Sequence, residues 1–166
     1  MWGVGVVSLG QEVTSDRQLA RLLQIGVVLE EVVEARAHRH YQSLSADERD
    51  PEVAALLEEA SEESARHRER LESLIDELNA ESIPFEEVET LVSEHYGSPD
   101  GFDGVLYDQL CSEETAYKFY DDLIAAIDAS DARFSVDRDR LRDLLAEIRE
   151  DEAEGVEEVT ALMERR

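Results

Sequence analysis

Glutamates and one histidine interrupt the apolar rows that this sequence shows at helical spacing, and these residues are the most able to do chemistry. Glu30 and Glu34 fall on neighbouring apolar rows of one segment, and His67 falls in the middle of the row of the next segment. Glu113 and Glu152 hold equivalent positions in two later segments. A buried carboxylate is costly unless it is paired, protonated or bound to a cation. Carboxylates that converge with an imidazole therefore predict a site for a divalent metal ion.

Two glutamates lie one helical turn from predicted ligands and can extend the site. Glu63 lies four residues before His67, and Glu30 lies four residues before Glu34. Residues at this spacing share one helix face, so a change of rotamer could bring either glutamate to the metal. We include both among the candidate ligands.

A metal-free interpretation stays open. Because 42 of the 166 residues are Asp or Glu, some glutamates fall on core rows by chance. A core histidine is also more often bonded to a carboxylate than to a metal. In this alternative the inner carboxylates pair with Arg36, Arg66 or Arg70, or stay protonated with raised pKa values. The chain would then be a metal-free bundle that acts as an interaction or regulatory module.

Four segments with helical periodicity must position these residues, and no segment alternates with the period of a strand. We expect helices over residues 16–44, 51–78, 102–129 and 136–163, each able to span a bundle of roughly 40 Å. The start signals are Asp16, the Asp50-Pro51 pair, the breaker cluster at 97–101 and Ser135. The apolar rows are Leu23-Glu30-Ala37-Leu44, Val27-Glu34-Tyr41, Val53-Ala60-His67-Leu74, Leu106-Glu113-Tyr120-Ile127, Leu141-Ile148-Gly155-Leu162 and Leu145-Glu152-Val159.

The connections predict the topology. Few residues join the first helix to the second and the third to the fourth, so each pair forms an antiparallel hairpin. About 23 residues separate the second helix from the third, and we expect a short helix from Pro84 to about His95 inside this crossover. Two hairpins joined by one long crossover form an all-α, ferritin-like four-helix bundle. Residues 16–166 would form this one domain, after an apolar leader, residues 1–15, that we expect to be disordered.

The composition excludes several classes of partner. Sixteen basic and 42 acidic residues give a net charge of −26, which repels phosphate backbones and anionic lipids, so we expect neither a nucleic-acid nor a membrane partner. The leader is too short to span a membrane and lacks the basic start of a signal peptide. Cys111 is the single cysteine, which suits a reducing compartment, and we expect a cytoplasmic protein. Lys118 is the single lysine, and this acidic, lysine-poor composition resembles that of halophilic, haloarchaeal proteins.

An internal repeat carries a resemblance to a family. Residues 34–41 and residues 113–120 both read E-x-x-A-x-x-x-Y. This octet resembles the first and third helices of rubrerythrin and bacterioferritin-like proteins, and the order and spacing of the helices match over nearly the whole chain. In that family, the glutamate of each octet binds a di-iron centre, and the second and fourth helices add E-x-x-H.

The resemblance implies a partly degenerate ligand set. The E-x-x-H positions correspond to Ser64 with His67 and to Glu152 with Gly155, so one motif lacks its glutamate and the other its histidine. The implied metal ligands are Glu34, His67, Glu113 and Glu152, with Tyr41 and Tyr120 hydrogen-bonded to ligand carboxylates. Four such groups satisfy one divalent ion more easily than two.

The resemblance implies a metal-binding protein. The metal would be iron, as a mononuclear or di-iron centre, or manganese, and the function would be iron handling or defence against peroxide. An oxidoreductase of the ferroxidase or peroxidase type would need an external electron donor, because the chain has no cysteine-rich rubredoxin domain.

Two further expectations concern assembly. Phe119 and Leu144 are predicted to point outward and to mark a homodimer contact. The mini-ferritins that shield DNA are a weaker match, since their ligands lie at a subunit interface and the octet repeat argues for a site inside one bundle.

Overall fold

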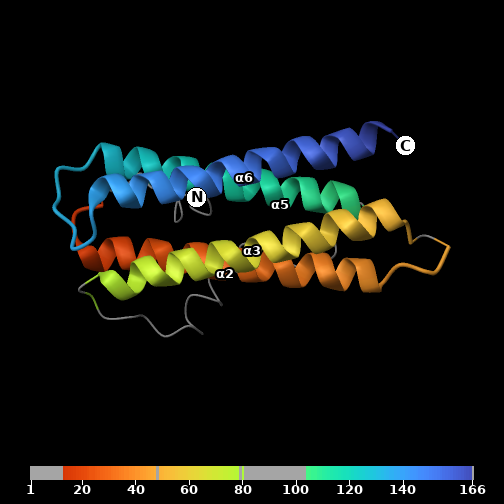
Figure 1. The fold of residues 1–166 in the computed structure, drawn as a ribbon, viewed down its shortest axis with the longest axis horizontal. Coiled ribbons are helices and arrows are strands. Elements are labelled where there is room, and N and C mark those ends of the chain that lie inside the picture. The colour runs from red at the N-terminus through yellow and green to blue at the C-terminus, as the bar shows by residue number, and fades with distance from the viewer. Residues whose placement is uncertain (1–12, 48, 79, 81–103, 166) are drawn as a thin grey trace, which may run out of the picture.

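Four long helices make up the protein in a computed structural model, which describes residues 13–47, 49–78, 80 and 104–165 (Figure 1). They are α2 (Asp16–Gln42), α3 (Pro51–Glu77), α5 (Val105–Asp128) and α6 (Arg138–Glu164). No strand occurs among the described residues, so the prediction of an all-α bundle is confirmed for them. No helical stretch in this part of the chain combines the length and the apolar character that a membrane crossing requires.

Local signals in the sequence explain where the helices begin. The Asp50 side chain caps α3 by accepting a hydrogen bond of 2.8 Å from the backbone N–H of Glu52, and Pro51 follows in the first turn. Asp137 caps α6 in the same way, through the backbone N–H of Arg140. Gly104 precedes α5 with a φ of 122°, a conformation that side chains with a Cβ rarely adopt.

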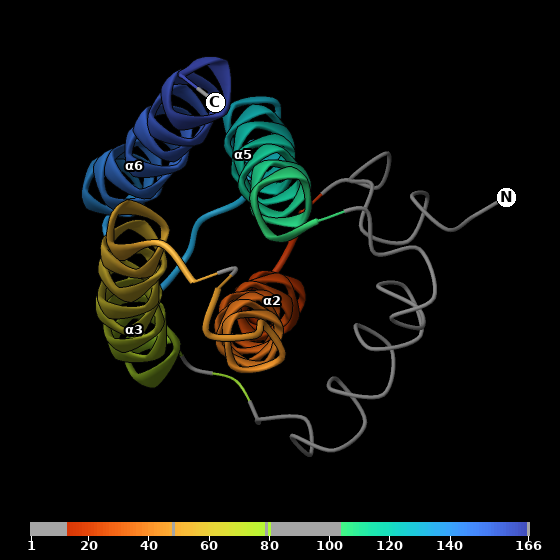
Figure 2. The ribbon, with the colours of Figure 1, turned by 90° about the vertical axis from the view of Figure 1, so that its right-hand side faces the viewer.

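The helices form two antiparallel hairpins. In the end-on view α2 lies beside α3 and α5, and α6 lies beside α5 and α3 (Figure 2). The helices α3 and α5 run in the same direction, so α3 ends and α5 begins at opposite ends of the bundle (Figure 1). The short helix predicted from Pro84 to His95 lies outside the described residues, as do residues 1–12 of the predicted leader. Of the remaining leader residues, Val13 is buried.

A polar layer divides the apolar core into two parts. The larger part lies at the end of the bundle where α2 begins, and the smaller part contains Ala37, Val53 and Leu57 near the other end. Between them every helix contributes buried polar side chains: Glu30, Ser64, His67, Gln109, Ser112, Glu113 and Glu152.

The prediction that Phe119 points outward is wrong. Its side chain is 6% exposed and packs edge-on against Tyr120 in the larger part of the core, with the two ring centroids 5.2 Å apart. Leu144 is partly buried against the same part of the core. The homodimer stays a prediction that these two residues do not support.

Candidate metal centre

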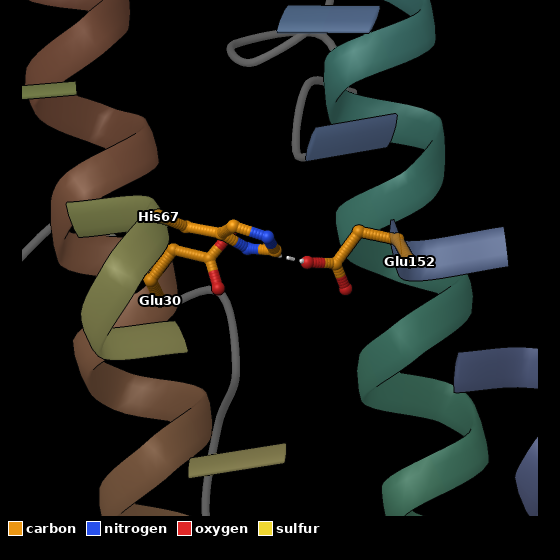
Figure 3. Close-up of side chains that lie close together, drawn as sticks. All are labelled: Glu30, His67 and Glu152. Atoms are coloured by element: carbon orange, nitrogen blue, oxygen red, sulfur yellow. Dashed lines mark hydrogen bonds and ion pairs between the residues drawn. The ribbon is translucent and has the colours of Figure 1, made fainter. Parts of the chain in front are cut away.

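Three of the predicted ligands converge in the polar layer. Glu30 of α2, His67 of α3 and Glu152 of α6 each offer one ligand atom, and these atoms lie within 4.8 Å of one another. Figure 3 shows Glu152 reaching toward the other two residues from the opposite side of the bundle. Their exposed fractions are 5% or less, so the cluster lies away from solvent.

Hydrogen bonds satisfy the carboxylate of Glu30 from several directions. The Ser64 hydroxyl donates to Oε1 at 2.9 Å, and the Tyr120 hydroxyl donates to Oε2 at 2.6 Å. Nδ1 of His67 lies 3.3 Å from the same Oε2. Three partners leave Glu30 well paired without any added cation.

Both ring nitrogens of His67 face carboxylates. Nδ1 lies 3.1 Å from Oε1 of Glu152, in addition to its contact with Glu30, and Nε2 lies 2.9 Å from Oδ2 of Asp151. Burial opposes the charged imidazolium, but these hydrogen bonds outweigh it and raise the pKa of His67 to about 11. His67 is therefore a buried cation among carboxylates.

A second group of carboxylates lies next to the first and shares Glu152 with it. Ligand atoms of Glu63, Glu113 and Glu152 also lie within 4.8 Å of one another. The Gln109 amide donates to Oε1 of Glu113 at 2.8 Å, but Oε2 of Glu113 is buried and has no hydrogen-bond partner. Glu113 is only 5% exposed, so this oxygen cannot turn to water.

Gly155 makes the room for this carboxylate. A Cβ built at Gly155 would lie 1.9 Å from Oε2 of Glu113, which is far inside van der Waals contact. Beside these two residues is a cavity of about 20 Å³, enough for roughly one water molecule or one ion. The cavity is bordered by the half-buried Glu63 and the exposed Glu59 and Glu158.

The three carboxyl groups of this second cluster all have raised pKa values. Burial raises the pKa of Glu63 to about 7 and that of Glu113 to about 7, although the neighbouring Glu152 and Gln109 side chains lower the pKa of Glu113. Burial, followed by the negative charge of Glu30, raises the pKa of Glu152 well above its ordinary value. Bound protons or a bound cation could each neutralise the group.

Glu34 and Tyr41 lie apart from these clusters. Glu34 is ion-paired with Arg68 and accepts a hydrogen bond of 3.0 Å from the Ser61 hydroxyl. The Tyr41 ring lies under the Arg49 guanidinium, whose central carbon is 5.5 Å from the ring centroid. Their row on α2 faces the edge of the bundle, whereas the row of Glu30 faces its centre. Of the two predicted tyrosines, Tyr120 is the one that hydrogen-bonds a clustered carboxylate.

The metal-free interpretation predicted that Arg36, Arg66 or Arg70 pairs with the inner carboxylates, but the ion pairs described for Arg36 and Arg70 are with other residues. Arg36 forms a bidentate ion pair with Asp108 at 2.8 Å, which ties α2 to α5. Arg70 contacts the exposed Glu147 at 3.7 Å, and Arg66 is exposed. The part of that interpretation that the structure favours is the raised pKa values of the inner carboxyl groups.

Sequence reasoning did not assign a role to three residues in or beside the polar layer. Ser64, which the resemblance predicted to be a lost ligand position, donates to Glu30, and Gln109 lies one turn before Glu113 on the same face of α5. Asp151 lies at the edge of the bundle with its side chain 36% exposed, off the apolar rows. The spacing of four residues between Gln109 and Glu113 could have predicted their hydrogen bond, whereas nothing in the sequence pointed to Asp151.

The donor set fits a divalent metal ion on three grounds. Oε2 of Glu113 is buried and unpartnered, a Cβ at Gly155 would fill the space beside it, and Glu113 belongs to a group of three carboxylates that shares Glu152 with the His67 cluster. No family model, curated protein or solved structure matched this chain when it was compared with them. The assignment of a function therefore depends on the chemistry of this centre.

Proposed function

We propose that this chain is a metal-binding four-helix bundle of the ferritin-like type, which binds iron or manganese within its polar layer and serves iron handling or defence against peroxide. The observation that carries the proposal is the buried Oε2 of Glu113, which lacks a hydrogen-bond partner inside a group of converging carboxylates. An uncompensated buried carboxylate oxygen costs several kcal/mol, and a bound cation removes that cost.

The topology supports the ferritin-like assignment. Two antiparallel hairpins whose inner helices run in the same direction require one long connection, which is the ferritin-like arrangement (Figure 1). The repeated octet adds to this support, because its second copy contains both Glu113 and Tyr120.

The spacing of the donors supports a metal ion of ordinary size. Ligand oxygens on opposite sides of such an ion are roughly 4.2 Å apart, since each metal–oxygen bond is about 2.1 Å long. Each cluster keeps its donor atoms within 4.8 Å, so small rotamer changes would bring them to bonding distance. Carboxylates suit manganese and magnesium, and added imidazole suits iron.

The residues of the layer would hold and orient such an ion in defined ways. Glu113 and Glu152 would supply carboxylate oxygens, and Gln109 would fix the orientation of Glu113 through its amide. A bound iron would supply one-electron redox chemistry. Reduction would depend on an external donor, because Cys111 is the single cysteine of the chain.

A metal-free interaction module is a second candidate, favoured by the position of His67. The imidazolium lies between Glu30, Asp151 and Glu152, so the protein supplies one positive charge to its own carboxylates. Protons on the remaining acids could neutralise the rest, without any metal.

Metal analysis separates the two candidates. The full chain is purified in high salt without chelator, loaded anaerobically with ferrous iron or Mn²⁺, desalted into the same salt, and measured for metal by elemental analysis. We expect one or two ions per chain, with loss of binding in Glu113→Gln. Glu114→Gln is the matched control, because Glu114 is the exposed neighbour of Glu113. A folded protein that retains neither ion would establish the metal-free candidate.

A further inference from the structure

We infer that the ion is bound by the carboxylates of Glu63, Glu113 and Glu152 through oxygen alone, and that His67 lies beside it as a hydrogen-bond partner instead of a ligand. This inference rests on the proposed function and specifies the position, the ligands and the class of the ion. We refer to these three residues as the carboxylate triad.

The neighbouring cluster of Glu30, His67 and Glu152 is closed. Each oxygen of Glu30 has a hydrogen-bond donor from Ser64 or Tyr120, and each ring nitrogen of His67 faces a carboxylate oxygen at 3.3 Å or less. A metal could take a nitrogen of His67 only by breaking one of these contacts. None of the buried side-chain oxygens and nitrogens of this cluster is without a hydrogen-bond partner.

The carboxylate triad, in contrast, includes an oxygen that no hydrogen-bond donor satisfies. Oε2 of Glu113, in a side chain that is 5% exposed, has no partner among the described residues. Gly155 leaves this oxygen its space, and the cavity of about 20 Å³ adjoins Glu63 and Glu113. Beyond Glu63 the cavity meets the exposed Glu59 and Glu158, whose charges would attract a cation toward the opening.

The ligand class follows from these atoms. Carboxylate oxygens and water suit hard ions such as Mn²⁺ and Mg²⁺, whereas imidazole adds affinity for zinc, copper and nickel. Glu63 and Glu113 line the cavity, and the ligand atom of Glu152 lies within 4.8 Å of theirs, so the triad can hold one ion and leave positions for water. We therefore assign one hard divalent cation per chain to the triad.

Titration of the full chain with MnCl₂ tests this assignment. Electron paramagnetic resonance measures free Mn²⁺, and its pulsed form detects coupling between bound Mn²⁺ and a ligand nitrogen. We expect one bound Mn²⁺ per chain without coupling to a nitrogen nucleus of His67.

Two variants locate the ion. Loss of even an outer partner of a metal ligand lowers affinity by about 10- to 100-fold, so Glu63→Gln should weaken Mn²⁺ binding at least about 10-fold. Glu62→Gln, in the exposed neighbour of Glu63, should not. Gly155→Ala should also weaken binding, because the new Cβ must displace the carboxylate of Glu113. That carboxylate is the mobile end of a side chain, so the helical circular dichroism of this variant should be unchanged.

Each result decides between the two proposals. Nitrogen coupling, or Mn²⁺ binding that survives Glu63→Gln and Gly155→Ala, would overturn the inference and leave the proposed function standing. Iron binding without Mn²⁺ binding would do the same. A chain that binds neither ion would remove the proposed function itself.

Discussion

At the scale of single residues, Glu152 joins the two halves of the polar layer. Its carboxyl group lies 3.1 Å from His67 on one side and belongs to the carboxylate triad on the other. Any change in the charge of the triad therefore reaches the imidazolium through one shared group. A cation in the triad would favour the ionised form of Glu152, and an ionised Glu152 would in turn strengthen its contact with His67.

The raised pKa values predict how the metal-free protein depends on pH. Glu63 and Glu113 have folded pKa values of about 7, above their ordinary value of 4.5, so folding favours their protonated forms. The stability that they contribute is present at low pH and is lost as pH rises through about 7. The pKa of His67 is also raised, from 6.5 to about 11, so the stability that His67 contributes is likewise lost as pH rises, but at higher pH. We expect the free energy of unfolding in chelator to fall between about pH 5 and pH 8, measured by urea denaturation in high salt.

A variant checks the origin of this pH dependence. Gln at position 113 keeps the shape of the side chain but has no titrating group, so Glu113→Gln should show a shallower fall in stability over the same pH range. Glu114→Gln should reproduce the wild-type curve, because Glu114 is exposed. A wild-type stability that rises with pH in this range would contradict the burial of protonated carboxyl groups.

At the scale of helices, start signals and apolar rows were sufficient to predict the elements. The predicted starts at Asp16 and Pro51 are the observed ones, and the predicted ends differ by one or two residues. Spacing alone could not decide which of two neighbouring rows on α2 faces the centre. Rotation of that helix by about half of its 100° step per residue would turn Glu34 instead of Glu30 toward the centre of the bundle. Packing against α3, through Arg68 and Ser64, distinguishes the two glutamates, and this information is not local in sequence.

The same limit applies to Gly155. From the resemblance to rubrerythrin-like proteins, Gly155 was predicted to mark a position that has lost a histidine ligand. In the structure its missing side chain is the space that Glu113 of another helix occupies. The glutamates and the histidine of the centre were thus predictable from their rows, whereas the pairing between helices depended on three-dimensional packing.

The cap of α3 provides a test at this scale. Asp50 accepts a hydrogen bond from the backbone N–H of Glu52 at the start of the helix, and the loss of such a cap costs about 1 kcal/mol. Asp50→Ala should lower the free energy of unfolding by that amount in high salt, without changing metal content. Asp47→Ala, in the exposed loop before the cap, is the control. Equal stabilities of the two variants would show that the cap contributes nothing measurable.

At the scale of the whole molecule, the net charge of −26 opposes the packing of four acidic helices. Cross-helix ion pairs such as Arg140 with Glu77 and Arg149 with Asp121 offset only a small part of this charge, and they are solvent-exposed. The repulsion therefore depends on dissolved salt. The Debye length is roughly 3 Å at 1 M salt, so charges on different helices are screened from one another. It is roughly 30 Å at 0.01 M, so these charges then repel one another.

Removal of salt should therefore unfold the metal-free protein. We expect its helical circular dichroism to fall on dialysis from molar salt to about 0.01 M, and to return when salt is restored. Sucrose at high concentration is the control, because it favours burial without screening charge. Full helicity at low salt would contradict the halophilic character predicted from composition. If one Mn²⁺ per chain preserves the helices at low salt, binding of the ion to the folded chain offsets the repulsion between the helices.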